Sequence, residues 1–84
     1  MPYKLTFQGE LALTVRGTAS EPDLTPLQYE ILEYLFEKGY RDTYVRASEV
    51  ANALGHHPQA VSGSLYSLFA GNFVVKGIEE IESW

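Results

Sequence analysis

The feature that most constrains this 84-residue chain is a very short connection between two apolar-patterned segments. Gly55, His56 and His57 separate a segment over about 49–54 from one that opens at Pro58. A glycine favours the backbone conformation that ends a helix, and proline suits the first position of the next helix. Because so few residues join them, the two helices must cross at a steep angle and pack against each other.

The apolar residues of both segments recur at helical spacing, which predicts that each helix buries one face. Ser48 can cap the first helix, whose inward residues are Val50, Ala51 and Leu54. The second helix, over 58–70, turns Val61, Leu65, Leu68 and Phe69 inward. Its other face then presents Gln59, Ala60, Ser62, Gly63 and Tyr66 to the surroundings.

A third helix, earlier in the chain, has the best-marked start. Thr25 is a natural N-cap, Pro26 suits the first helical position and Gln28 completes a capping box. Lys38 and Gly39 favour the end of this helix. Its apolar stripe comprises Leu27, Ile31, Leu32, Leu35 and Phe36, and three acidic residues, Glu30, Glu33 and Glu37, fall outside that stripe.

Residues 3–16 alternate between apolar and polar on both sides of a break at 8–10, which predicts a β-hairpin. A two-residue loop would leave the two apolar sets on opposite faces. A three-residue loop pairs Tyr3 with Val15, Leu5 with Leu13 and Phe7 with Leu11, so that one face is wholly apolar. We therefore expect a hairpin over 3–16 and a loop over 17–23.

The remaining strand-forming segments are short. Residues 44–46 predict one short strand. Residues 73–75 and 78–81 flank Lys76 and Gly77, which predict either a tight turn or a break in one extended strand. An acidic end follows over 77–84.

A family pattern is present in four stretches and two single residues of the chain: 24–32, 46–55, 58–62 and 71–74, with Leu65 and Leu68. Over residues 24–76 the chain resembles winged helix-turn-helix domains of the multiple-antibiotic-resistance-regulator (MarR-like) type. With the N-terminal hairpin, we expect one α+β domain over 1–84, with three helices and a short C-terminal wing hairpin. The absence of cysteine excludes disulfides and cysteine-ligated zinc, so packing must stabilise it.

The resemblance implies a small DNA-binding transcriptional regulator that inserts the helix 58–70 into the major groove of double-stranded DNA. Gln59 would pair with an adenine, and Ser62 would contact a phosphate or a base. The full set of implied DNA-binding residues is Arg41, Arg46, Ser48, His57, Gln59, Ala60, Ser62, Gly63, Tyr66 and Lys76. The small size suggests a homodimer, joined by the hairpin face or by the helix that starts at Pro26.

Charge favours an alternative, a protein-interaction module that acts as an adaptor, inhibitor or DNA mimic on a nucleic-acid-handling protein. The chain has a net charge of −5, and no cation lies between Pro58 and Ala70. Lys76 is followed by Glu79, Glu80 and Glu82. Lys38, Arg41 and Arg46 could form a patch for the DNA backbone, yet Arg41 and Arg46 are placed equally well to pair with Asp42, Glu37 or Glu49.

Other features point away from catalysis and from metal binding. Ser62, Ser64 and Ser67 lack a nucleophile signature, and no Gly-x-Ser-x-Gly elbow occurs. The side chains of His56 and His57 diverge, and His57 is explained as the residue before a helix-starting proline. We predict no enzymatic activity, cofactor or metal, and the lack of a signal peptide or membrane span predicts a cytoplasmic protein.

Overall fold

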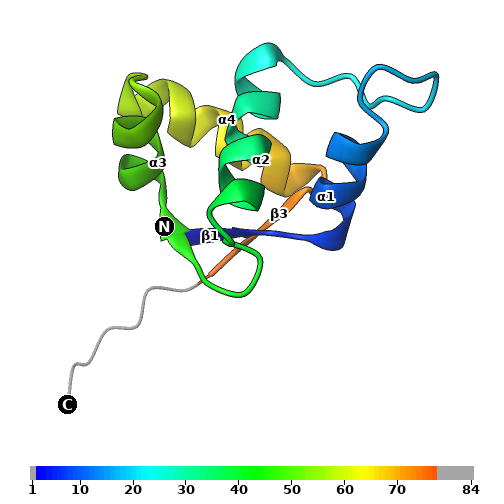
Figure 1. Cartoon of the computed structure of the whole chain (residues 1–84). Coiled ribbons are helices and arrows are strands. Elements are labelled where there is room, and N and C mark those ends of the chain that lie inside the picture. Colours follow the sequence, from blue (N-terminus) through cyan, green and yellow to red (C-terminus); the bar gives the residue numbers. More distant parts are fainter. Residues whose placement is uncertain (1, 78–84) are drawn as a thin grey trace.

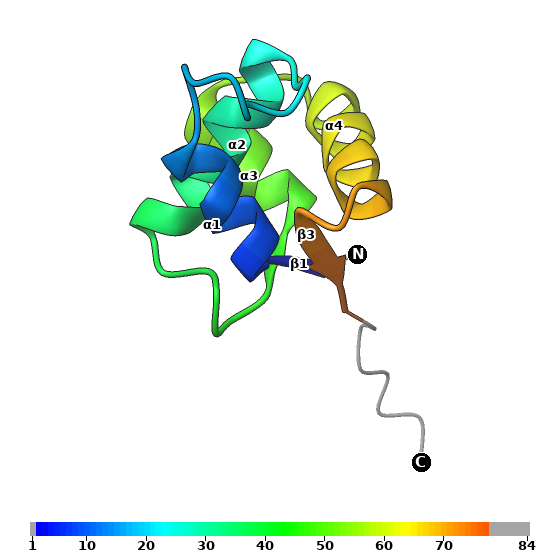
Figure 2. The ribbon, with the colours of Figure 1, turned by 90° about the vertical axis from the view of Figure 1, so that its right-hand side faces the viewer.

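The computed structural model describes residues 2–77, which form an α+β fold with helices packed over one side of a small sheet (Figures 1 and 2). Within these residues there are four helices and one three-stranded antiparallel sheet. The elements in chain order are β1 (Pro2–Leu5), α1 (Phe7–Thr14), α2 (Pro26–Glu37), β2 (Val45–Arg46), α3 (Ala47–Leu54), α4 (Pro58–Ala70) and β3 (Val74–Lys76). None of these helices has the length and apolarity needed to cross a bilayer.

The sheet has the strand order β2-β1-β3, so the N-terminal strand lies at its centre. Tyr3 pairs with Val45 on one side, and Leu5 pairs with Val74 on the other. All four side chains are buried beneath the helices. The predicted strand at 73–75 is thus confirmed, but its partner is β1, and the proposed wing strand 78–81 lies outside the described residues.

The predicted N-terminal hairpin over 3–16 is wrong: only residues 3–5 of it form a strand, which pairs with β2 and β3, and residues 7–14 form α1. The Thr6 hydroxyl accepts a hydrogen bond from the Gly9 amide at 3.0 Å and donates one to the Asn72 carbonyl at 2.7 Å. Since β3 supplies the strand partner of β1, residues after Leu5 are free to turn into a helix. Residues 2–77 consequently contain four helices where three were expected.

The start of α2 is confirmed as a capping box. The Gln28 amide donates to the Thr25 hydroxyl at 3.2 Å, and the Thr25 amide donates to the Gln28 side-chain oxygen at 2.8 Å. At the other end, Gly39 has a φ of +77°, a left-handed conformation that ends the helix as predicted.

Ser48 is not the N-cap of α3, contrary to the prediction. The helix begins at Ala47, and the capping position is Arg46, whose side chain makes no capping hydrogen bond. Arg46 is still paired with Pro2 in the sheet, so extended backbone continues up to the first helical residue. The strand pairing therefore sets where α3 starts.

The core lies between the sheet and the helices. Its fully buried large side chains come from α2, α3, α4 and β3: Ile31, Leu32, Leu35, Val50, Val61, Leu65, Leu68 and Val74. In residues 2–77 no polar or charged residue is buried. The predicted inward stripes of the three sequence-marked helices thus meet in one cluster, except for Phe36, which is 48% exposed because it lies at the edge of the α2 stripe.

Candidate functional site

The connection between α3 and α4 fixes the direction of α4. Gly55 has a φ of +73°, which ends α3 in the left-handed conformation, and Pro58 is the first residue of α4. The Nδ1 atom of His57 accepts a hydrogen bond from the Gln59 amide at 3.1 Å, so His57 caps the helix. His57, which the resemblance placed among the DNA-binding residues, therefore has a structural role as the N-cap of α4.

Helix α4 has one buried face and one open face. Val61, Leu65 and Leu68 are completely buried. All five residues predicted to face outward are exposed, and we call them the α4 outer face: Gln59, Ala60, Ser62, Gly63 and Tyr66. This face has no charged side chain, and most of its side chains are small, so another surface could approach the helix closely.

Gly63 lies in the middle of α4 without an internal reason to be glycine. A glycine there costs about 1 kcal/mol relative to alanine, and a close neighbour that leaves no room for a side chain would explain it. Within residues 2–77 a Cβ atom added at Gly63 would meet nothing within 4 Å. The described part of the chain does not explain this glycine, and its backbone stays accessible from outside.

Lys76 lies beside the α4 outer face. Its Nζ atom is 5.8 Å from the ring centroid of Tyr66 and 5.1 Å from that of Phe69, a cation–π arrangement. Tyr66 keeps 60% of its surface exposed. Burial raises the pKa of the neighbouring Tyr3, and Tyr66 adds to that rise.

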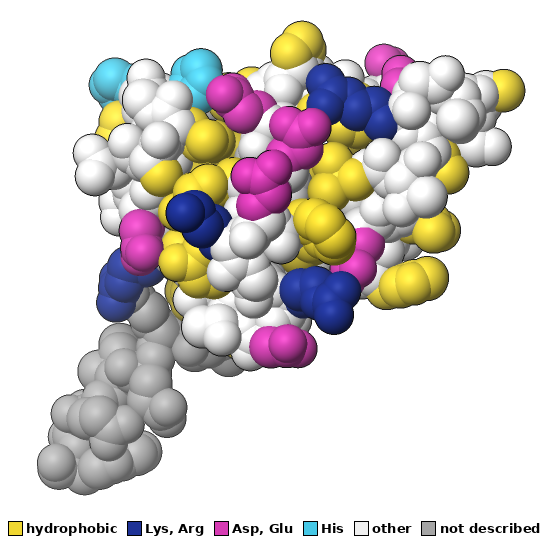
Figure 3. Space-filling view, in the orientation of Figure 1, with side chains coloured by type: hydrophobic (Ala, Val, Ile, Leu, Met, Phe, Trp, Pro, Cys, Tyr) yellow, Lys and Arg dark blue, Asp and Glu magenta, His cyan; other side chains and the backbone are white. Residues whose placement is uncertain are grey.

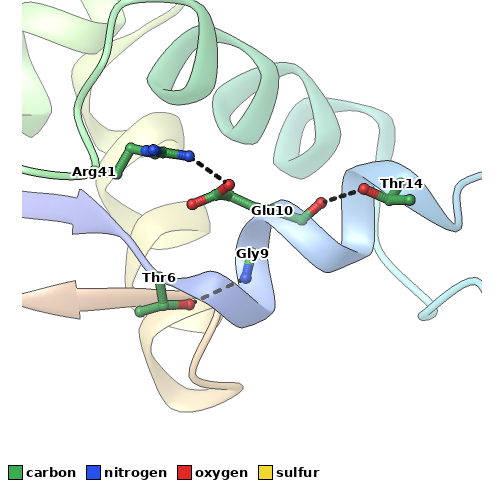
Figure 4. A network of polar contacts seen from close by, with 5 residues as sticks. All are labelled: Thr6, Gly9, Glu10, Thr14 and Arg41. Carbon is green, nitrogen blue, oxygen red and sulfur yellow. Dashed lines mark hydrogen bonds and ion pairs between the residues drawn. The ribbon is translucent and has the colours of Figure 1, made fainter.

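Three other predicted site residues lie in two regions: Arg46 and Ser48 at the junction of β2 and α3, and Arg41 beside α1. Arg46 and Ser48 are exposed where β2 joins α3. Arg41 does not pair with Asp42, Glu37 or Glu49. Its guanidinium lies 2.8 Å from the Glu10 carboxylate of α1, on a helix that sequence reasoning had missed (Figure 4). Arg41 is therefore held at α1 and does not extend the α4 outer face.

Within residues 2–77, acidic side chains lie outside α4 and β3. Acidic side chains follow one another along α2, with basic side chains beside them (Figure 3). Glu30 contacts the Nε2 atom of His56 at 2.9 Å, and Glu33 pairs with Arg16 at 2.9 Å. The α4 outer face itself therefore contributes no negative charge.

The two adjacent histidines have separate partners, because His56 contacts Glu30 and His57 caps α4. Among residues 2–77, no group of three or more His, Cys, Asp or Glu side chains is placed to hold a metal ion.

Comparison of the chain with models of protein families, with curated proteins and with solved structures gives no match.

Proposed function

We propose that the protein binds double-stranded DNA as a small regulator, with the α4 outer face in the major groove. The observation that carries the proposal is an exposed, acid-free helix face that follows a three-residue turn and has Lys76 at its side. The major groove of B-DNA is wide enough to admit one α-helix. In this proposal α3 and α4 act as a helix-turn-helix, and β3 takes the place of a wing.

The residue types on the α4 outer face suit base contacts. Gln59, in the first turn, has an amide that can pair with both edge groups of an adenine. Ser62 follows on the same face and can donate to a phosphate or a base. Ala60 and Gly63 add almost no bulk, which lets the helix backbone come close to the groove floor.

The cations available for phosphate contacts are few. Of the six basic residues, Arg16 and Arg41 are in ion pairs with acidic side chains, and Lys76 lies beside the α4 outer face. Each phosphate neutralised contributes about −0.9 to the slope of log K against log salt. For this site we therefore expect weak binding with a slope of about −1 to −2, and tight binding only when two copies bind adjacent half-sites.

Fluorescence anisotropy with a random-sequence duplex at about 50 mM salt tests the proposal. Lys76→Gln should lower the affinity several-fold and make the salt slope shallower by about one. The matched control is Arg16→Gln, which also removes one cation but from a side chain engaged with Glu33. No binding at low salt, or an equal loss in both variants, would contradict the proposal.

A second candidate is a protein-interaction module that presents acidic side chains to a basic, nucleic-acid-handling partner. The observation in its favour is the row of exposed glutamates on α2, Glu30, Glu33 and Glu37, beside an α4 without any cation. Two of these three carboxylates already have basic partners, which weakens the negative field. Binding to a basic polypeptide that is lost in Glu37→Gln, without DNA binding, would favour this function.

A further inference from the structure

Helix α1 presents large apolar side chains to the surroundings. Phe7 is 75% exposed, more than any other large apolar residue in 2–77, and Leu11, one turn later, is 46% exposed. The fully buried residues of the same helix are the small Gly9 and Ala12, and Leu13 is partly buried against the core. Burying an exposed phenylalanine is worth about 1.5–3 kcal/mol, so this face favours contact with another apolar surface.

An apolar groove lies directly beside these side chains. It measures about 250 Å³ and is lined by Gln8, Leu11, Ala12, Val15, Ser20, Pro22 and Phe73. This is smaller than the roughly 300–1,000 Å³ of typical small-molecule sites, and it suits a single inserted side chain. We call Phe7 together with the groove residues the α1 surface.

The α1 surface differs in charge from the rest of the molecule. None of its residues is charged. The nearby Glu10 and Arg16 point to other partners, Arg41 and Glu33 respectively. Two copies that each carry a charge of −5 repel one another, and most strongly if the glutamates of α2 face each other. Like the α4 outer face, the α1 surface has no acidic residue of its own, so two copies that meet there keep the glutamates of α2 apart.

The same surface contains both a protruding side chain and a groove to receive one. Phe7 and Leu11 lie four residues apart on α1, and Leu11 is itself part of the groove wall. In a two-fold arrangement the Phe7 ring of each copy would enter the groove of the other, which makes the contact reciprocal and closed. A projecting ring beside a groove in one element is what a self-complementary interface requires.

We propose that the α1 surface binds a second copy of this chain, in a two-fold dimer with each Phe7 in the partner's groove. A stable interface buries about 800 Å² on each partner, roughly a seventh of the 5404 Å² surface of this chain. The helix α1 has eight residues and is about 12 Å long, so we expect a weak dimer that forms at micromolar concentrations or above. The dimer does not depend on the proposed DNA binding.

Sedimentation velocity of the full chain without DNA, from about 1 μM to several hundred μM, measures the dimer directly. Phe7→Ser should raise the dissociation constant at least about tenfold, as expected for an aromatic anchor. Phe36→Ser is the matched control, because Phe36 is 48% exposed on α2 but outside the α1 surface. A chain that stays monomeric throughout, or an equal loss in both variants, would overturn the proposal.

Cross-linking tests the two-fold geometry, and because the chain has no natural cysteine, only the introduced cysteine can react. A Leu11→Cys chain should form a covalent dimer with a short bifunctional thiol cross-linker, because Leu11 lines the groove that holds the partner copy's Phe7. Glu37→Cys on α2 should not. Circular dichroism of all variants shows whether they are folded. Efficient cross-linking at position 37 but not at position 11 would assign the contact to another face.

Discussion

Helices α1 and α4 each contain an interior glycine, and the two glycines have opposite surroundings. A Cβ atom at Gly9 in α1 would clash with the Phe73 carbonyl and lie 2.6 Å from the Leu5 Cδ1 atom, whereas one at Gly63 in α4 would meet nothing. Gly9 lets two parts of this fold come together. Gly63 leaves the backbone open to a partner from outside, which is what the proposed DNA contact uses.

The two helices also differ in where their large side chains point. Helix α4 turns Leu65 and Leu68 into the core and leaves mostly small or polar residues outside, with Tyr66 as the large exception, whereas α1 buries Gly9 and Ala12 and leaves Phe7 outside. The first arrangement suits a helix that contacts a polar, charged ligand. The second suits a helix that contacts another protein surface. Substitutions in both helices can test this contrast.

The largest difference should appear when a leucine is truncated in each helix. Leu65→Ala removes a completely buried side chain and should lower the free energy of unfolding by about 2–5 kcal/mol. Leu11→Ala, at a position that is 46% exposed, should cost less than about 1 kcal/mol in dilute solution. Urea denaturation followed by circular dichroism measures both, and equal losses would show that α1 is not solvent-facing.

Gly9→Ala should be the next largest effect. The added methyl group forces α1 away from Phe73 and Leu5, so we expect a loss of about 1–3 kcal/mol. Thermal unfolding at low protein concentration measures it in the monomer. A stability within about 0.5 kcal/mol of the wild type would mean that α1 does not pack closely against this loop.

The starts of the helices provide a smaller test. Thr6→Ala removes a cap of α1 and a link to Asn72, and should cost about 0.5–2 kcal/mol. Ser48→Ala should change the free energy of unfolding by less than about 0.5 kcal/mol, because the Ser48 side chain does not cap α3. If Ser48→Ala lowered the free energy of unfolding more than Thr6→Ala in urea denaturation, Ser48 would have the capping role that the sequence suggested.

Gly63→Ala should give the smallest change in stability, and in the opposite direction to Gly9→Ala. With open space around the new methyl group, we expect a gain of about 0.5–1 kcal/mol from better helix propensity. The same variant should bind DNA more weakly if α4 closely approaches the groove. Higher stability with unchanged DNA affinity would exclude close contact at Gly63 while leaving Gln59 to be tested separately.

The sequence by itself determined α2, α3 and α4, because their signals are local. A capping box at Thr25 and Gln28, left-handed glycines at 39 and 55, and apolar residues at helical spacing each act within a few residues. The exposed positions on α4 follow from the same spacing, so the α4 outer face was predictable residue by residue.

Only the tertiary structure decided the form of residues 7–14. Phe7, Leu11, Leu13 and Val15 alternate well enough for a strand, and the choice of α1 depends on β3, which lies some seventy residues away and pairs with β1. The pairing of Arg41 with Glu10, across 31 residues, is equally non-local. Local hydrogen bonds and helix periodicity depend on residues that are neighbours in the sequence, whereas strand partners and long-range ion pairs depend on which segments the folded chain brings together.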